Sequence, residues 1–246
     1  PNDEGVLVGT VIQAGAAFGY VQPGDVLLAI DGYPIFSDGR VQMDGERVLL
    51  HEIVDRTDKG VPGQLTGWRQ GREFTVQVPL GIPWPYLMQS RRHDVRPRYV
   101  VFAGIVFQPI SLNYMRSAKI NRLDVLYYYH RFQEDELYLD KPAVIIISKL
   151  LPDPIHTYLQ GHTFSVVEEI NGQKVQTLED VATAFEADER QWRIRLAGSG
   201  RPIILERDAV EAARESIAGN YNVLQPSYLG DSIVPESWKR GRKRFQ

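Results

Sequence analysis

The sequence contains no cysteine in its 246 residues. This absence excludes disulfide scaffolds, thiol catalysis and cysteine-based zinc sites, and it leaves the redox compartment open. An excess of charge is missing too, because 28 basic and 31 acidic residues give a formal net charge of −3. The chain as a whole therefore has no electrostatic attraction for nucleic acid or for an anionic membrane, and only a local patch could supply one.

Long uninterrupted hydrophobic runs are also lacking. Residues 5–24 carry no charge, but they contain five glycines and a proline, and no basic segment precedes them as in a signal peptide. Residues 99–115 are interrupted by polar residues before they reach membrane-spanning length. We therefore expect no membrane span. With 43% hydrophobic and 24% charged residues the composition is that of a globular protein, and the length predicts two small domains.

One order of structural elements recurs along the chain. Each copy has two apolar strands, then a helix, then two final strands. In the first copy these elements are expected at residues 6–12, 26–32, about 45–57, 65–68 and 74–78. In the second copy they are expected at residues 143–148, 164–172, from about 178, 192–196 and 202–206. In both copies the second strand ends in a dipeptide that tolerates positive φ, Asp31-Gly32 or Asn171-Gly172, which predicts a tight hairpin turn.

The helix of the second copy has a clear start. Thr177 and Asp180 have the spacing of a capping box, and apolar residues recur at helical spacing after them. The helix of the first copy, over residues 45–57, is predicted from apolar residues such as Leu50 and Ile53 that would share one face.

Proline and charge separate the two copies. Three prolines between residues 83 and 97 exclude a continuous helix or central strand, so the segment is predicted to be a semi-rigid linker. A tyrosine-rich and leucine-rich insertion interrupts the second copy, and a basic cluster at residues 239–244 closes the chain. The expected domain boundaries are 1–82 for the first domain, 83–98 for the linker, 99–210 for the second domain with its insertion at 112–140, and 211–246 for a C-terminal extension with the basic tail.

The repeat resembles the tandem PDZ region of HtrA/Deg-type serine proteases, in particular plant-type Deg proteases. In the first copy the resemblance is carried by Gly5-Val6-Leu7-Val8, Pro23-Gly24-Asp25-Val26-Leu27 and Ile30-Asp31-Gly32. In the second copy it is carried by residues 103–110 (Ala-Gly-Ile-Val-Phe-Gln-Pro-Ile), 147–151 and 167–172. The resemblance covers roughly residues 5 to 210. It implies an α+β, mainly β fold of two PDZ-like domains, each a small, partly open β-barrel capped by helices.

A PDZ domain binds a peptide as an added strand between a sheet edge and a helix, while a glycine-containing loop before the edge strand receives the carboxylate. The expected peptide-binding residues lie on that loop and strand and on the helix that faces them. They are Ala103, Gly104, Ile105, Val106, Phe107, Leu178, Val181, Ala182 and Phe185. For each of them a place in the core is an equally simple interpretation. The family resemblance also leaves open whether the groove holds an internal segment or a neighbouring subunit.

The first copy departs from the family pattern. In the family the carboxylate-binding loop and its edge strand lie upstream of the strand that matches residues 5–12, and here only residues 1–4 precede it. We therefore expect the first domain to lack its N-terminal edge strand. We also expect the chain to be a fragment of a longer protein, with a trypsin-like protease domain upstream as the resemblance implies.

No catalytic or cofactor site is expected within the chain. Ser199 lies between two short strands, so a hairpin turn explains it better than a triad serine. The five histidines show no metal-ligand spacing, and no glycine-rich loop opens a helix, so neither a metal nor a nucleotide cofactor is predicted. The basic tail, assisted by the run from Arg91 to Arg98, could contact nucleic acid, but a solvated tail is the simpler interpretation.

We therefore expect the non-catalytic, peptide-binding and oligomer-assembly half of an HtrA/Deg-type serine endopeptidase. Its expected partners are hydrophobic peptide termini or unfolded protein segments, the upstream protease domain and further copies of itself in a homo-oligomer. The resemblance implies an extracytoplasmic or organellar location. The alternative is a stand-alone PDZ scaffold or adaptor without associated protease activity.

Overall fold

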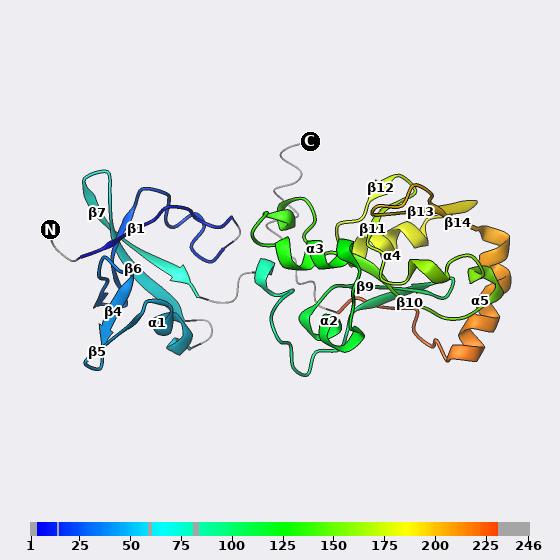
Figure 1. Ribbon diagram of the computed structural model, residues 1–246, viewed down its shortest axis with the longest axis horizontal. Helices are drawn as coiled ribbons and strands as arrows, with labels where there is room; N and C mark the ends of the chain where they lie inside the picture. Colours follow the sequence, from blue (N-terminus) through cyan, green and yellow to red (C-terminus); the bar gives the residue numbers. More distant parts are fainter. Residues whose placement is uncertain (1–3, 14, 59–60, 81–83, 231–246) are drawn as a thin grey trace. The chain divides into compact units, whose positions relative to one another are not determined.

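The computed structural model describes residues 4–13, 15–58, 61–80 and 84–230 (Figure 1). The chain divides into two compact units, Pro1–Trp84 and Pro85–Gln246. The basic cluster at residues 239–244 lies outside the described residues, and so do residues 81–83, the last of which is the first residue of the expected linker.

The first unit is built on an antiparallel sheet with the strand order β1-β2-β6-β7, and the short β3 also pairs with β2. Its strands are β1 (Val6–Leu7), β2 (Val26–Ile30), β3 (Tyr33–Pro34), β6 (Pro62–Arg69) and β7 (Arg72–Pro79). The turn between β2 and β3 holds Asp31 at φ +47° and Gly32 at φ +82°, which confirms the predicted hairpin. The two strands predicted near residues 65–68 and 74–78 are also confirmed, as the β6-β7 hairpin.

The helix expected over residues 45–57 is wrong in its first half. β4 (Arg40–Met43) and β5 (Glu46–Leu49) form a hairpin, and only α1 (His51–Arg56) is helical. The reason is the two-residue turn Asp44-Gly45, in which both residues have positive φ. Such a turn favours two paired strands over a continuous helix.

Asp25, from the Pro-Gly-Asp motif of the first unit, is a structural residue. Its side chain is 1% exposed and accepts hydrogen bonds from Arg69 Nε and Nη2, each at 2.7 Å, and from the Gln22 backbone N–H at 2.8 Å. The guanidinium of Arg69 also lies over the Phe74 ring. These contacts fasten the loop before β2 to the end of β6, beside the core of this unit. That core consists of Val21, Ile30, Ile35, Val41, Met43, Ile53, Leu65 and Val78.

The second unit contains two open four-stranded antiparallel sheets, and one of them combines strands from both ends of the unit. Its strand order is β10-β9-β8-β15. The strands are β8 (Tyr99–Phe102), β9 (Ile105–Pro109), β10 (Ile145–Leu150) and β15 (Ser227–Tyr228). The side chains of Ile105, Phe107, Ile145 and Ile147 are fully buried, so the middle of this sheet belongs to the core.

The other sheet has the order β12-β11-β13-β14, and it shares one hydrophobic core with α4. Its elements are β11 (Val167–Ile170), β12 (Gln173–Lys174), β13 (Gln191–Leu196) and β14 (Ile203–Glu206), with α4 (Leu178–Glu186) between β12 and β13. The predicted capping box is present, because Thr177 and Asp180 exchange both side-chain bonds. The order β11-β13-β14 repeats β2-β6-β7 of the first unit, as the sequence repeat indicates.

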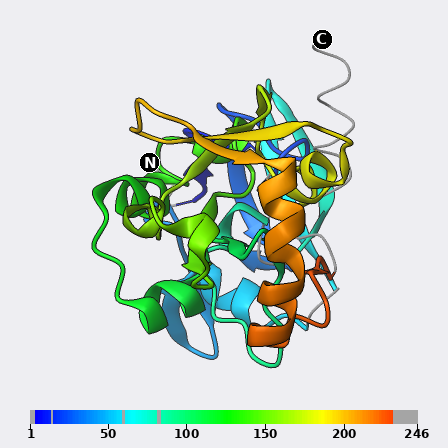
Figure 2. The same cartoon turned by 90° about the vertical axis from the view of Figure 1, so that its right-hand side faces the viewer.

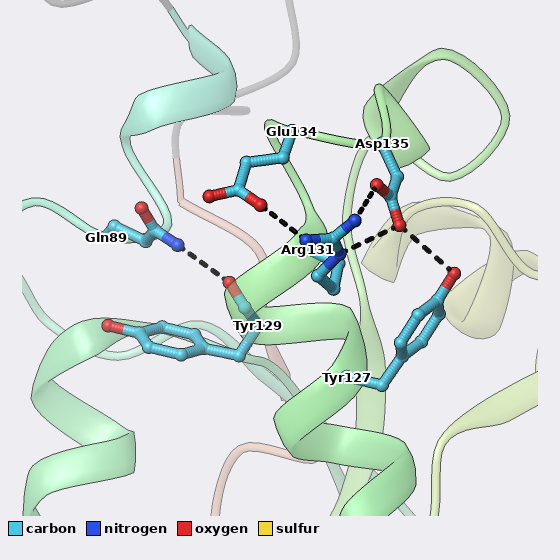
Figure 3. A network of polar contacts seen from close by, with 6 residues as sticks. All are labelled: Gln89, Tyr127, Tyr129, Arg131, Glu134 and Asp135. Atoms are coloured by element: carbon cyan, nitrogen blue, oxygen red, sulfur yellow. Dashed lines mark hydrogen bonds and ion pairs between the residues drawn. The ribbon is translucent and has the colours of Figure 1, made fainter.

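The insertion is helical in part, as expected. It forms α2 (Leu112–Ala118), α3 (Leu123–Arg131) and a 3-10 turn, η2 (Leu137–Leu139). Figure 3 shows Arg131 at the end of α3 between Glu134 and Asp135, and Gln89 donating through Nε2 to the Tyr129 carbonyl at 2.7 Å. The expected linker is therefore hydrogen-bonded to the insertion through Gln89, which follows the short η1 turn (Trp84–Tyr86).

The C-terminal part of the described chain packs on the second unit. α5 (Arg207–Tyr221), orange in Figure 2, continues directly from β14 and buries Val210, Ala213 and Ile217. After it, β15 pairs with β8. The packing of this unit thus continues to about residue 230, past residue 210, where the sequence placed the end of the second domain.

Strand residues outnumber helical ones in the described chain, and none of the sheets closes into a barrel. The expected α+β, mainly β class is therefore confirmed, with open sheets.

Candidate peptide-binding groove

The hairpin of β8 and β9 occupies the place where sequence predicts the carboxylate-binding loop. Its two-residue turn holds Ala103 at φ +48° and Gly104 at φ +76°. β9 pairs with β8 along one edge and with β10 along the other. Because both edges of β9 are paired within the chain, a peptide cannot add to β9 unless one of its neighbours leaves. β8 itself lies beside α4.

The imidazole of His156 packs against this turn. It lies on the 3-10 turn η3 (Pro154–His156), is 3% exposed, and its Nε2 contacts the Ala103 carbonyl oxygen. A Cβ atom at position 104 would lie 2.6 Å from His156 Cε1. Glycine is therefore required at 104 for two reasons, the positive φ and the space that the imidazole takes.

An apolar groove of about 590 Å³ is lined by residues of β8 and α4, and we call it the aromatic groove. Phe102 of β8 stacks on Phe185 of α4, with the ring centroids 4.0 Å apart, and meets the edge of Trp192 at 4.7 Å. α5 and the chain that follows it complete the lining. The volume lies within the range of small-ligand and peptide side-chain pockets.

The nine residues predicted to bind peptide do not all reach the aromatic groove. Those that line it are Ala103, Gly104, Ala182 and Phe185. Those that lie fully buried in the core beneath are Ile105, Phe107, Leu178 and Val181. Val106 is half-buried in β9 between its two partner strands.

Two elements of the groove were not predicted as part of a site. α5 contributes Val210 and Ile217 to the lining, and the following chain contributes Leu224. The helical spacing of Val210, Ala213 and Ile217 is the sequence signal of a packed helix face in this segment. β15 is too short to be recognised from sequence, because only Ser227 and Tyr228 are in register with β8.

β15 covers the outer edge of β8 only in part. Ser227 pairs with Val100 and Tyr228 with Tyr99, and the Val101 N–H donates to the Pro226 carbonyl at 2.6 Å. Phe102 therefore has no backbone partner from β15. Next to the groove, the outer edge of β8 is therefore paired along only part of its length, by a segment of the same chain.

Ser199 lies in the turn of the β13-β14 hairpin, as the sequence predicts, and its Oγ donates to the Arg201 carbonyl at 2.9 Å. Among residues 4–13, 15–58, 61–80 and 84–230, no three His, Asp or Glu side chains gather as metal ligands would. In the same part of the chain no helix has both the length and the apolar character needed to cross a bilayer.

Comparison with known proteins identifies the fold of the second unit. The sequence model of the PDZ domain family matches residues 88–227. The chain is 24% identical over 226 residues to "Putative protease Do-like 12, mitochondrial" of Arabidopsis thaliana, which covers 91% of this chain and 40% of that protein. It is 22% identical over 230 residues to "Protease Do-like 2, chloroplastic" of the same plant, covering 91% and 37%. It is 26% identical over 166 residues to "Serine protease DegP homolog" of Plasmodium falciparum, covering 66% and 18%.

The chain thus spans about two fifths of the length of the first of these relatives and less of the others. The family match includes the β8-β9 hairpin, α4 and α5, which line the aromatic groove, and it ends at Ser227 of β15. The chain therefore belongs to the PDZ domain family and carries a PDZ region of the HtrA/Deg protease type.

Proposed function

We propose that the second unit captures apolar peptide termini or segments by β-augmentation, in the aromatic groove. The observation that supports this proposal is the outer edge of β8, which is paired by only two residues of β15. This edge lies beside a groove that aromatic side chains line. A peptide that replaces β15 gains backbone hydrogen bonds to β8 and buries its side chains against Phe102, Phe185 and Trp192.

The proposal is tested with a fluorescein-labelled decapeptide of alternating valine and serine, with a free C-terminal carboxylate, and with its amidated twin. Fluorescence polarisation measures the Kd of each. Phe185→Ala removes the ring that stacks on Phe102, so we expect binding at least tenfold weaker. Tyr158→Ala is the matched control, because this aromatic side chain is 92% exposed and lies outside the groove lining. Equal Kd values for the two variants contradict the proposal.

The twin peptide separates capture of termini from capture of internal segments. A preference for the free carboxylate indicates that the Ala103-Gly104 turn receives the terminus, as predicted from sequence. Equal affinity for the two peptides indicates capture of segments. A chain that ends at Asn222 and lacks β15 is expected to bind more tightly than the full chain, since the peptide no longer competes with β15 for the edge of β8.

Assembly of a homo-oligomer is the second role that we propose for this region. A second copy of the chain can add a strand to β8 by the same backbone bonds as a peptide. Light scattering after gel filtration measures the oligomer size of the chain and of Phe185→Ala. An unchanged size in the variant contradicts a role of this groove in assembly.

We propose that the whole protein is a serine endopeptidase in which this chain is the non-catalytic half. The support is the match to three longer relatives with protease names. The gene upstream of residue 1 is expected to encode the catalytic His and Asp and a Gly-Asn-Ser-Gly-Gly segment. Their absence would favour the alternative, a PDZ scaffold without protease activity.

A further inference from the structure

A second groove of the same unit lies outside the β-augmentation site, and we call it the arginine groove. It has a volume of about 380 Å³ and lies between the segment before β8 and the segment that joins the end of β9 to α2. The two segments are held together by hydrogen bonds from the Leu112 N–H to the Met88 carbonyl at 2.8 Å and from Asn113 Nδ2 to the Arg92 carbonyl at 2.6 Å. The groove is therefore a fixed hollow of the fold.

The interior of the arginine groove is mostly apolar. Met88 and Ile110 are buried, and Leu87 and Tyr114 are half-buried, at its wall. Three arginines, Arg92, Arg96 and Arg98, also belong to the lining, and no Asp or Glu does. An apolar hollow with cationic side chains and no carboxylate favours a ligand that is both apolar and anionic.

The surrounding sequence strengthens the positive potential. Residues 91–122 contain seven arginines and lysines and one acidic residue, Asp94, which gives this stretch a net charge of +6 in a chain whose net charge is −3. The seven basic residues are Arg91, Arg92, Arg96, Arg98, Arg116, Lys119 and Arg122.

The three lining arginines differ in how far their charge is neutralised. Arg98 is paired with Glu179 at 2.7 Å. Within the described residues the contacts of the Arg96 guanidinium are with neutral groups, because it stacks on Tyr228 at 4.1 Å and donates to the Tyr99 hydroxyl at 3.3 Å and to Gln225 Oε1 at 3.2 Å. Neither Arg92 nor Arg96 forms an ion pair with a carboxylate in the part of the chain that the structure describes. Neutral partners orient a guanidinium without cancelling its charge, so Arg92 and Arg96 keep their charge for a ligand.

We propose that the arginine groove binds a small amphipathic carboxylate. Arg92 and Arg96 hold the carboxylate through charge-assisted hydrogen bonds, and the aliphatic or aromatic body lies against Met88, Ile110 and Tyr114. The volume is at the low end for ligand pockets, which fits a small molecule better than a protein segment. This site is separate from the aromatic groove, so the proposal does not depend on peptide binding.

The probe is octanoate, compared with octanol of the same chain length and with octyltrimethylammonium of opposite charge. Calorimetry on the full chain measures each Kd, and amide chemical-shift perturbation locates the bound probe. We expect saturable octanoate binding at one site, with shifts at residues 87–98 and 108–117. Octanol is expected to bind at least tenfold more weakly, the cation not at all, and octanoate affinity is expected to fall in 0.5 M salt.

Two variants and a matched control test the residues. Arg92→Gln and Arg96→Gln are each expected to weaken octanoate binding about tenfold, whereas Arg91→Gln, next in sequence but outside the lining, leaves it within twofold. Thermal unfolding of all three establishes that they fold. Equal affinities for octanoate and octanol, an unchanged Kd in both Arg92→Gln and Arg96→Gln, or octanoate shifts at Phe185 would each overturn the proposal. It is also overturned if an apolar peptide with a free carboxylate binds this groove and octanoate does not.

Discussion

The guanidinium of Arg98 lies 2.7 Å from the carboxylate of Glu179 and connects the residue before β8 with the first turn of α4. Arg98 Nε also donates to the Leu229 carbonyl oxygen, just after β15. The Arg98 side chain is 7% exposed and that of Glu179 is 31% exposed. One arginine therefore joins three segments that are far apart in sequence.

Removal of one partner of this pair should destabilise the second unit. Arg98→Met removes both the cation that faces the partly buried Glu179 carboxylate and the donor to the Leu229 carbonyl, so we expect the free energy of unfolding to fall by about 2–4 kcal/mol. Urea unfolding followed by circular dichroism measures the loss. Glu134→Gln is the control, because it removes one partner of an exposed pair with Arg131 and should change stability far less. Losses of equal size would show that the Arg98 pair contributes no more than a surface pair.

The turn between β8 and β9 should tolerate only glycine at position 104. Gly104→Ala must adopt positive φ, which costs about 1–2 kcal/mol, and must also displace His156. Gly172→Ala is a matched control, since Gly172 has φ +79° and nothing lies within 4 Å of its added Cβ. We expect thermal unfolding to show a larger loss for Gly104→Ala. If both variants lose the same stability, the imidazole does not restrict this position.

Acid should weaken the first unit through Asp25. Hydrogen bonds from Arg69 lower the pKa of the Asp25 carboxyl below its ordinary value of 3.8. A depressed carboxyl pKa contributes stability above the unfolded-state pKa, and this contribution is lost as the pH falls through the folded-state pKa. Asp25→Asn is expected to lose roughly 1.5–3 kcal/mol at pH 7. Its stability difference from the unchanged chain, measured by urea unfolding between pH 7 and pH 2, should shrink below about pH 4.

A rise in pH above about 8 should stabilise the second unit through Lys141. Burial lowers the pKa of the Lys141 ammonium to about 8, and its Nζ donates to the Val167 carbonyl at 2.9 Å. The unfolded chain then binds more protons than the folded chain from about pH 8 to the ordinary lysine pKa of 10.5, so stability rises with pH in this window.

The rise is on the order of 3 kcal/mol if it is complete, and it should be absent in Lys141→Met. Urea unfolding between pH 7.5 and pH 10 measures it. This range stays below the titration of Tyr138, whose pKa burial raises to about 12. A rise of the same size in the variant would assign the effect to another group.

Local signals in the sequence were sufficient for many elements. Thr177 and Asp180 predict the start of α4 because a capping box depends on residues only three apart. Asp31-Gly32 predicts its hairpin because a two-residue turn selects residues that accept positive φ. The same rule applies to Asp44-Gly45, where the apolar spacing of the following residues outweighed the turn signal and gave the wrong helix.

The parts that depend on contacts distant in sequence could not be predicted. β15 pairs with β8 across more than 120 residues, and no local pattern specifies this partner for Ser227 and Tyr228. The pairing of Arg98 with Glu179 is of the same kind. For the candidate site, sequence alone could not separate Phe185, which lines the aromatic groove, from Val181, which lies in the core one helical turn earlier.

The antiparallel pairing of β8 with β15 has a mechanical consequence. Tyr99, at the start of β8, is opposite Tyr228, at the end of β15, so the chain enters β8 and leaves β15 at the same end of the ladder. Tension applied directly between Arg98 and Leu229 would load the hydrogen bonds of the ladder one after another, as in unzipping, and not all at once, as in shear. Arg98, bonded to the Leu229 carbonyl just outside the ladder, would take the load first.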